Sequence, residues 1–308
     1  MSEIKIGVVT DSHMGGFDSC IAEALKKEEV DRIEYLGDAT KNIRTSPQEQ
    51  FDDIAATLKI YNNVGVPVSW IPGNYEDFDA YHAAFQQLED DLDNVVDATR
   101  LGKYTLKING IEVDLVWIPG ARDFSRGFRV RDDFPTGDYC IESSGQVNRV
   151  HNFNPHDLET LVTNPEGTIV LAHNPIQMSR DDTFDFAMHA IYQGQEEGGP
   201  AARELIRSGF AKPKPVHSGN PLVGRIIDKI GIKKYISGDI HEAVFTTDRQ
   251  GRPVPPGTFS RELFGNPGPA KDGRYGVLVY RDDRMATLYS KSVKSLEAVR
   301  EAKGRKEN

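Results

Sequence analysis

Five groups of side chains that can bind metal ions recur along the sequence, each directly after a short apolar run. They are Asp11-Ser12-His13, Gly37-Asp38, Pro72-Gly73-Asn74, His173-Asn174 and Gly238-Asp239-Ile240-His241. Imidazole and carboxylate groups are common ligands of divalent transition metals, and amide oxygens also bind cations. In the pattern Asp-x-His on an extended segment, both side chains point to the same side, so both can reach one ion. These residue types predict a shared metal site.

Each of these groups has an ordinary structural interpretation when it is taken alone. An Asp after a Gly is commonly a turn or helix-cap residue, and an isolated His is commonly a hydrogen-bonded surface or core residue. Chance explains the joint pattern less well, because all five groups follow apolar runs and all carry suitable ligand atoms. Glycine precedes three of the groups, and a residue without a side chain lets the backbone pass close to a metal or a phosphate. The joint pattern therefore favours one common site.

Short β-branched runs alternate with segments of helical periodicity along the chain. The strand-like runs are 4–9, 33–36, 66–71, 111–118, 168–171, 234–236 and 275–280. Helices are predicted after Ser46-Pro47, Asn154-Pro155 and Asn220-Pro221, where a capping side chain precedes a first-turn proline. Gly231 is expected to end the last of these helices. The alternation predicts an α/β protein with a largely parallel sheet, and such sheets bind ligands beyond the carboxyl ends of their strands.

Charge balance and cysteine count restrict the function classes. The 308 residues include 37 Lys and Arg against 47 Asp and Glu, a net charge of −10. This charge argues against broad electrostatic binding to nucleic acid or anionic membranes, although a local basic groove remains open. The chain has two cysteines, Cys20 and Cys140, no charged-then-apolar leader and no apolar stretch long enough for a bilayer. We expect a cytoplasmic protein that binds no membrane, with nucleic acid not indicated and the oligomeric state open.

Taken together, the motifs resemble those of the calcineurin-like metallophosphoesterases, which run Asp-x-His, Gly-Asp, Gly-Asn-His-Asp/Glu, His and Gly-His-x-His. The resemblance extends from Asp11 to His241. The segment 264–268 and the run 275–280 look like the family's closing Asn-Pro-Gly turn and edge strand, and His217-Ser218-Gly219 resembles a His-x-Gly element of some members. The resemblance implies a four-layer αββα sandwich, with two mixed β-sheets flanked by helices and the metals at one edge.

The resemblance also implies a ligand set and a reaction. The first metal would be bound by Asp11, His13, Asp38 and His241, and the second by Asp38, Asn74, His173 and Asp239. Asp38 would bridge two divalent ions about 3.5–4 Å apart, because each of its oxygens can serve one ion. The expected reaction is hydrolysis of a phosphodiester or a phosphomonoester by a metal-bridging hydroxide, with a nuclease as the nearest variant. The donor set favours Mn, Fe, Zn, Ni or Co over an all-oxygen Mg or Ca site.

The sequence departs from the family pattern at Tyr75, which stands where the family has a histidine that protonates the leaving group or stabilises charge. A phenol, with an ordinary pKa near 10, donates a hydrogen bond but is a poorer proton donor at neutral pH than an imidazolium. Substrates with good leaving groups should therefore suffer least. The alternative is that Tyr75 packs under the site and that His217 or His82 supplies the proton. Asn74, Tyr75 and His217 are accordingly the candidate catalytic residues.

A second departure is Asp239, at the place of the first histidine in Gly-His-x-His. Aspartate can still bind a metal, but it makes the site more negative by one charge than a neutral imidazole does. We therefore expect weaker Lewis acidity and a shift toward harder ions, with Mn²⁺ first. The alternative is that Asp239 turns away, leaving the second metal weakly bound or absent.

Three further regions bear on substrate and partners. Guanidinium groups suit phosphate, and four arginines lie close together at Arg122, Arg126, Arg129 and Arg131. Acidic residues among them favour a solvated loop with internal ion pairs. Residues 1–290 are expected to form one domain, with 174–219 as a cap or lid insertion and 291–308 as a basic, loosely held tail.

The competing function is a catalytically impaired binding scaffold. A retromer subunit of this fold also lacks the histidine that Tyr75 replaces, and it serves mainly in protein contacts.

Overall fold

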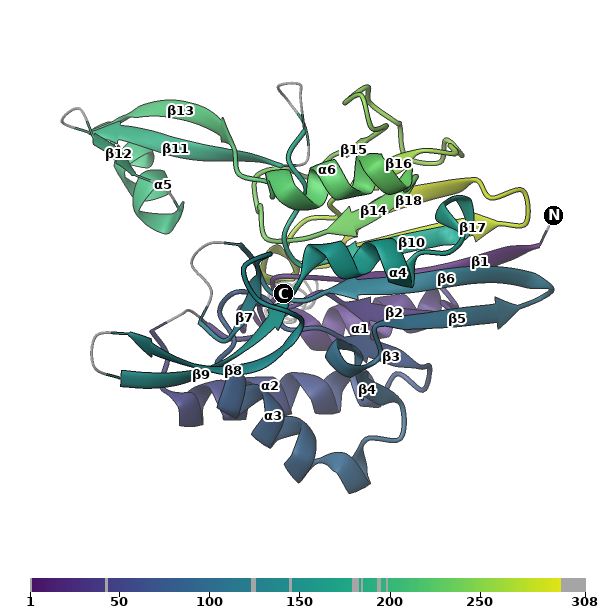
Figure 1. Cartoon of the computed structure of the whole chain (residues 1–308), viewed down its shortest axis with the longest axis horizontal. Coiled ribbons are helices and arrows are strands. Elements are labelled where there is room, and N and C mark those ends of the chain that lie inside the picture. The colour runs from purple at the N-terminus through teal and green to yellow at the C-terminus, as the bar shows by residue number, and fades with distance from the viewer. Residues whose placement is uncertain are drawn as a thin grey trace, which may run out of the picture.

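Two six-stranded mixed sheets form the centre of the molecule (Figure 1). The computed structural model describes residues 2–41, 44–122, 126–143, 146–178, 183, 185–192, 195–197 and 199–294. In the first sheet the strands lie in the order β18 (Ala286–Ser292), β17 (Arg274–Arg281), β1 (Glu3–Val9), β2 (Arg32–Tyr35), β3 (Val68–Trp70) and β4 (Val95–Asp97). In the second the order is β15 (Thr246–Thr247), β16 (Leu263–Gly265), β14 (Lys234–Ser237), β10 (Thr168–Ala172), β6 (Ile111–Ile118) and β5 (Lys103–Ile108).

Parallel pairing predominates where the predicted ligands follow the strands. Strands β1 to β4 are parallel to one another, and so are β6, β10, β14 and β16. Antiparallel strands lie at the edges, with β17 and β18 on one sheet and β5 and β15 on the other. The carboxyl ends of the parallel strands therefore meet at one side of the molecule.

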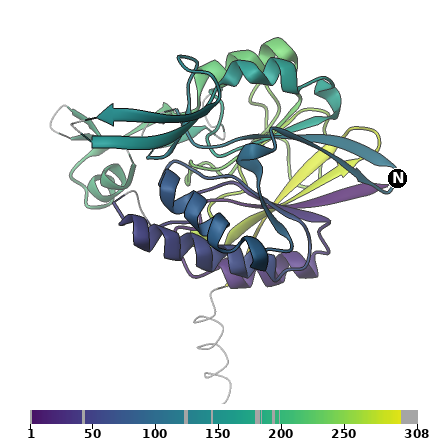
Figure 2. The same cartoon turned by 60° about the horizontal axis from the view of Figure 1, so that its bottom comes forward.

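Helices cover the outer face of each sheet, giving four layers. Figure 2 shows the purple and blue helices α1 (Asp18–Lys27), α2 (Pro47–Asn62) and α3 (Phe78–Gln87) beneath the first sheet. The helices α4 (Leu158–Leu161) and α6 (Pro221–Ile230) pack on the second sheet through one apolar cluster. A separate apolar cluster joins the two sheets face to face, with Ile6 and Leu278 from one and Leu171 and Ile236 from the other. The predicted four-layer αββα sandwich is thus confirmed.

Two of the three predicted helix starts lead into full helices. Ser46 and Glu49 form a reciprocal capping box at the start of α2, and the Asn220 side chain caps α6, which ends at Gly231 in the left-handed region. The start at Asn154-Pro155 instead leads into a single 3₁₀ turn and the four residues of α4. Pro165 follows closely, and a proline disfavours helical backbone at the residue before it. This helix is therefore much shorter than its start predicted.

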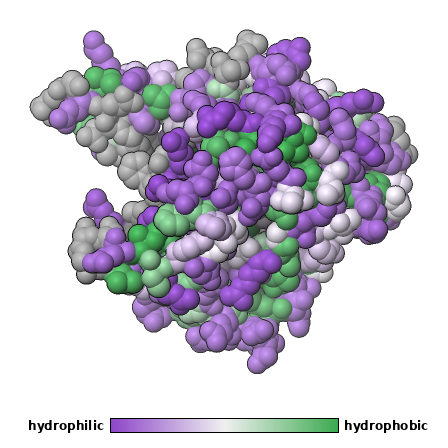
Figure 3. Space-filling view, in the orientation of Figure 1, coloured by the Kyte–Doolittle hydropathy of each residue, from purple (hydrophilic) through white to green (hydrophobic). Residues whose placement is uncertain are grey.

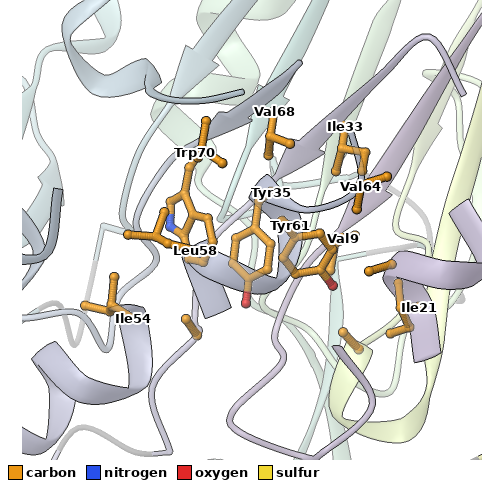
Figure 4. Packing of buried hydrophobic residues seen from close by; sticks show 14 of the residues in the cluster. Val9, Ile21, Ile33, Tyr35, Ile54, Leu58, Tyr61, Val64, Val68 and Trp70 are labelled. Atoms are coloured by element: carbon orange, nitrogen blue, oxygen red, sulfur yellow. The ribbon is translucent and has the colours of Figure 1, made fainter. Parts of the chain in front are cut away.

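The core between the helices and the first sheet is built on aromatic side chains (Figure 4). The ring of Trp70 stacks on Tyr35 with centroids 3.7 Å apart, and Tyr61 meets Tyr35 edge-on at 5.3 Å. Such pairs add about 0.5–1.5 kcal/mol each beyond the burial of their area. The Tyr35 hydroxyl donates to Ser12 Oγ at 2.7 Å, in the loop that follows β1. The rigid core thereby fixes the first loop that carries predicted ligands.

Two smaller sheets project from the body. One consists of β7 (Phe128–Val130), β8 (Gly137–Ser143) and β9 (Gln146–Phe153); the other consists of β11 (Phe186–Tyr192), β12 (Gln195–Glu197) and β13 (Lys212–His217), with α5 (Gly199–Arg207) against β11. In Figure 1, β1 starts at the right and runs left, and both projections extend from the left, where the parallel strands end. Figure 3 shows a notch in the surface between them. No helix in the described ranges is long and apolar enough to cross a membrane.

Candidate metal centre

The seven predicted metal ligands follow the carboxyl ends of five strands from both sheets. Asp11 and His13 follow β1, Asp38 follows β2 and Asn74 follows β3. From the second sheet, His173 follows β10, while Asp239 and His241 follow β14. Because the sheets pack face to face with their parallel strands ending at the same side, these loops converge on one rim.

One half of the centre combines Asp11, His13 and His241. A ligand atom of each lies within 4.8 Å of the others. The Nε2 atoms of His13 and His241 are 3.2 Å apart, and His241 Nε2 is 3.5 Å from Asp11 Oδ1. Two imidazole nitrogens and one carboxylate oxygen thus face a common point.

The other half combines Asp11, Asp38 and His173, whose ligand atoms also lie within 4.8 Å of one another. His173 Nε2 is 3.6 Å from Asp38 Oδ2 and 3.9 Å from Asp239 Oδ1. The Asn74 side-chain oxygen lies 3.2 Å from His173 Nε2; with the amide turned over, its nitrogen can donate to the two Asp38 oxygens at 2.9 and 3.2 Å. The structure therefore brings Asn74 and Asp239 to this half as well.

Asp38 lies between the two halves. Its Oδ2 atom is 3.7 Å from His13 Nε2 and 3.6 Å from His173 Nε2. Asp11 also belongs to both groups of three, although the sequence pattern assigned it to the first half alone. Two carboxylates, rather than one, are therefore in reach of both halves.

The ligand loops have unusual backbone conformations. Asp11, His13, Asp38 and Asp239 have φ values of 56°, 42°, 58° and 65°, in the left-handed region. Residues other than glycine rarely adopt it, and such residues gather at functional sites. Glycine leaves the necessary room nearby: a Cβ atom on Gly73 would come 2.1 Å from Asp38 Oδ1, and one on Gly238 would come 1.7 Å from Thr10 Oγ1. At Gly73 and Gly238 the backbone thus passes close to other groups of the site, as the glycines in the motifs indicated.

Hydrogen bonds behind the ligands orient them. His13 Nδ1 lies 3.0 Å from the Thr40 carbonyl oxygen, and His173 Nδ1 lies 2.7 Å from that of Leu36. Donation from Nδ1–H to a carbonyl leaves the Nε2 lone pair free to face a cation. Asn266, from the Asn-Pro-Gly turn, donates through its amide to the Ile240 carbonyl at 2.9 Å, which fixes the loop of Asp239 and His241.

Sequence reasoning missed the role of Glu76. This buried carboxylate accepts hydrogen bonds from the backbone N–H groups of Gly73 at 2.7 Å and Ala39 at 2.6 Å, so it ties the loop after β2 to the loop after β3. Its place in Gly73-Asn74-Tyr75-Glu76, where the family has Asp or Glu, was the available signal.

The acidic groups of the centre are crowded in a buried volume. Burial, opposed by His173, raises the pKa of Asp38 well above its usual range, and the charges of Glu76 and Asp11 raise it further. Burial also raises the pKa of Asp239. For Asp11 burial acts in the same direction, but the hydrogen bond and charge of His241 outweigh it and lower the pKa below its usual range. Carboxylates crowded in this way are stabilised by cations.

The two central imidazoles differ in electrostatic environment. Burial lowers the pKa of His13 to about 3. Burial acts in the same direction on His173, but the nearby charges of Asp38 and Asp239 outweigh it and raise the pKa to about 9. The centre combines three carboxylates, three imidazoles and one amide, a donor set that fits divalent transition metals.

Asp239 does not turn away from the centre. Its backbone N–H donates to Asp11 Oδ2 at 3.0 Å, and its side chain, 21 % exposed, accepts a hydrogen bond from the Asn174 amide at 2.6 Å. Asn174 thus orients Asp239, a role that the sequence did not reveal.

The candidate proton donors occupy different places. The ring of Tyr75 lies 4.9 Å from that of His13, and the Tyr75 N–H donates to Asp38 Oδ1 at 3.0 Å. His217 ends β13 and holds the buried Asp185 carboxylate at 3.0 Å through Nδ1. The bridge between Ile176 and Asn220 brings the chain after His217 beside the chain after His173. His82 instead lies on α3, with its Nδ1 3.9 Å from Asp97.

The arginine-rich segment contains one internal ion pair, as the sequence indicated, and a second ion pair to a residue outside the segment. Arg126 pairs with Asp77 at 3.2 Å and Arg131 with Asp133 at 2.6 Å. Parts of the predicted cap and tail, namely residues 179–182, 184, 193–194, 198 and 295–308, lie outside the described residues.

Comparison with solved structures supports the fold. The comparison with curated protein sequences found no match. One solved structure aligns with a TM-score of 0.57 at 11% identity, covering 95% of this chain and 100% of its own. The structure of TT1561 from Thermus thermophilus aligns with a TM-score of 0.53 at 12% identity, with the same coverage. At these identities the two alignments show the fold alone.

The sequence profile gives the family directly. The profile of the calcineurin-like phosphoesterases matches residues 4–243, which span all seven predicted ligands. With this match and the four-layer fold, the chain belongs to the calcineurin-like phosphoesterase family.

Proposed function

We propose that this protein is a metal-dependent hydrolase that uses two divalent cations to cleave a phosphodiester or a phosphomonoester. The observation that carries the proposal is the position of Asp38 Oδ2, at 3.7 and 3.6 Å from the Nε2 atoms of His13 and His173. These separations exceed a direct hydrogen bond, so cations can lie between the carboxylate and each imidazole. Asp38 is thus suited to bind an ion on each side.

The ligand sets that we propose follow the two halves of the centre. Asp11, His13, Asp38 and His241 would bind one ion, and Asp38, Asn74, His173 and Asp239 the other. Mn²⁺ is the first choice, with Fe, Zn, Ni or Co as alternatives, because three carboxylates make the site harder than one richer in imidazole. Bound divalent cations lower the pKa of water and neutralise charge on a phosphoryl group.

Protein groups must handle the leaving group. We propose that Tyr75 donates a hydrogen bond to the substrate and that His217 protonates the leaving oxygen. The support for His217 is Asp185, a fully buried carboxylate that also accepts from Met178 N at 2.9 Å and Thr183 Oγ1 at 2.6 Å. A carboxylate held in this way fixes the imidazole by its Nδ1 and directs Nε2 outward. Asn74, beside Asp38 and His173, would orient the phosphoryl group.

The domain boundaries and location are proposals as well. Residues 1–290 would act as one catalytic domain, with 174–219 as a cap whose strands β11 to β13 project on the side of the metal centre. Cys20 and Cys140 are both free thiols, which fits a reducing compartment such as the cytoplasm.

The test is hydrolysis of bis-p-nitrophenyl phosphate and p-nitrophenyl phosphate with added Mn²⁺. The wild type is expected to turn over at least one of them, and Asp38→Asn is expected to lower kcat/KM by roughly 10⁴-fold, because both ions lose a ligand. Asp282→Asn, which changes an acid remote from the centre, is the matched control and should keep full activity. Circular dichroism should show that all three proteins are folded.

The competing scaffold function predicts a different result. Tyr75 and Asp239 depart from the family motifs, and a folded wild type that binds Mn²⁺ without turnover on either ester would favour the scaffold. A comparison of aryl with alkyl phosphate esters then tests the leaving-group assignment: His217→Ala should slow the alkyl ester more than the aryl ester, since a poor leaving group depends on protonation.

A further inference from the structure

Asn174 contacts Asp239 from the neighbouring strand end. Strands β10 and β14 pair in parallel, and just beyond them the Gly238 N–H donates to the His173 carbonyl at 2.9 Å. Asn174 and Asp239 come next in the two chains, and the Asn174 amide donates to Asp239 Oδ2 at 2.6 Å. The register of the second sheet therefore places the amide beside the carboxylate.

The amide acts from a fixed position. Asn174 is 9% exposed, and its backbone carbonyl accepts a hydrogen bond from the Tyr235 hydroxyl at 2.7 Å. Tyr235 lies on β14 and is fully buried. Pro175 follows Asn174, and a proline restricts the residue before it to extended backbone. Both the main chain and the burial of Asn174 thus hold its side chain against Asp239.

The contact makes the two oxygens of Asp239 different. Oδ2 accepts from Asn174, whereas Oδ1 lies 3.9 Å from His173 Nε2, in the second half of the centre. The Asp239 N–H donates to Asp11 Oδ2 at 3.0 Å, so the main chain of Asp239 is fixed as well. A carboxylate can bind a cation through one oxygen or through both, and a hydrogen bond to one oxygen favours the other. Asp239 therefore presents one oxygen in a fixed direction, as an imidazole presents one nitrogen.

We propose that Asn174 is a positioning residue that restricts Asp239 to one metal-binding oxygen, so that the two residues together replace the histidine of the family motif. The proposal rests on the function proposed above, because it requires the second metal site. It also predicts a selectivity between cations. Ca²⁺ binds about six to eight oxygens and readily takes both oxygens of a carboxylate. Without Asn174, a freed Oδ2 can compensate Ca²⁺ for the lost orientation of Asp239, whereas the smaller Mn²⁺ gains less.

The first experiment measures the binding of Mn²⁺ and of Ca²⁺ to metal-free protein by titration calorimetry. Asn174→Ala is expected to weaken one Mn²⁺ site by about 10- to 100-fold, the usual effect of losing a group that orients a metal ligand, and to leave the other site unchanged. Its affinity for Ca²⁺ should fall by less than about 3-fold. Asn94→Ala is the matched control and should change neither affinity, because it removes an amide that donates to the Asn62 carbonyl just before β4, away from the strand ends that carry the ligands.

A double-mutant cycle separates positioning of Asp239 from general support of the loop. Asp239→His restores the family residue, which has no second oxygen to hold. In this background Asn174→Ala should change Mn²⁺ affinity by less than about 2-fold, because the two substitutions act through one contact. Equal losses in both backgrounds would overturn the proposal, and so would equal losses of Mn²⁺ and Ca²⁺ binding in Asn174→Ala alone.

Neither measurement needs turnover, so the two proposals can fail separately. A wild type that binds two Mn²⁺ ions without cleaving either ester would contradict the proposed hydrolase and leave the role of Asn174 intact. An Asn174→Ala variant that binds Mn²⁺ as the wild type does would contradict the role of Asn174 alone. Binding of a single Mn²⁺ ion by the wild type would contradict the second metal site, and the role of Asn174 with it.

Discussion

Two regions of this molecule bury charged side chains, and they satisfy them in different ways. Between the sheets, Glu34 accepts from Arg32 Nε at 2.5 Å and from Trp117 Nε1 at 2.7 Å, and Arg32 also donates to Ser69 Oγ. At the rim, carboxylate oxygens and imidazole nitrogens face one another at 3.5–3.9 Å. The inner cluster, Arg32, Glu34, Ser69 and Trp117, is thus closed within the protein, whereas the rim leaves room for cations.

The backbone conformations of the two regions also differ. Arg32 and Glu34 lie on β2 and Ser69 on β3, in regular parallel pairing. Four of the rim residues instead have left-handed backbone. The difference teaches that buried charge alone does not identify a binding site. Separations longer than a hydrogen bond, together with strained loops at strand ends, are the features that mark the rim as a candidate site.

The largest effect should come from opening the inner cluster. Glu34→Gln leaves the guanidinium of Arg32 buried without a carboxylate, and breaking a buried ion pair typically costs about 3–5 kcal/mol. We expect urea unfolding of the metal-free protein to show a loss of this size. Glu112→Gln breaks the exposed pair with Lys107 and should change stability by less than about 1 kcal/mol.

The same variant tests whether the two regions are independent. Mn²⁺ affinity and stoichiometry should be unchanged in Glu34→Gln, because its partners stay between the sheets. A large loss of Mn²⁺ binding would show that the inner cluster is part of the metal centre and would contradict the independence of the two regions.

A third kind of buried carboxylate, Asp18, has no cation in its described contacts. It accepts from the Tyr61 hydroxyl at 3.0 Å, and burial raises its pKa to about 6 from an ordinary 3.8. The native state therefore binds the carboxyl proton of Asp18 more tightly than the unfolded state does. The free energy of unfolding accordingly falls as the pH rises from about 4 through 6. Asp18→Asn keeps an oxygen for Tyr61 and removes the titration.

At pH 8, Asp18→Asn should be more stable than the wild type by up to about 3 kcal/mol, from about two pKa units at 1.36 kcal/mol each. The gap should shrink as the pH falls through 6 and 4, and it should level off below about pH 3, where Asp18 is protonated in both the native and the unfolded state. Denaturant curves of the two proteins at each pH measure the difference, in which other titrating groups cancel. A gap that grows toward low pH would show that the sign is wrong.

Sequence reasoning predicted the fold, which is confirmed, and a candidate ligand set whose side chains the structure brings together, for physical reasons that also mark its limits. Candidate ligands could be selected at the strand ends because Asp11, His13, Asp38, His173 and His241 follow apolar runs directly. The resemblance to a family supplied the pairing of the two sheets, which periodicity alone does not encode. The sharing of Asp11 by both halves depends on side-chain direction, and no residue spacing carries that.

What was missed depends on contacts that are distant in sequence. Asn174 meets Asp239 from 65 residues away, and Trp117 meets Glu34 from 83 residues away. Strand β7 was expected only as part of an arginine-rich loop and β11 to β13 only as part of a long insertion, and β8 and β9 were not predicted, because these partly exposed runs lack a clear apolar alternation.

The smallest effect is the most direct test of the comparison. At a free concentration about 100 times its Kd, Mn²⁺ should stabilise the native wild type by about 2.7 kcal/mol, because the unfolded chain lacks the assembled site. Thermal unfolding with and without Mn²⁺, with chelator as the reverse control, measures this increment. Glu34→Gln should gain the same increment from a lower starting point, since effects at separate sites add. Asp38→Asn should gain little. An equal increment in Asp38→Asn would mean that Mn²⁺ stabilises the protein somewhere other than the rim, and the contrast between an open and a closed charged cluster would then fail.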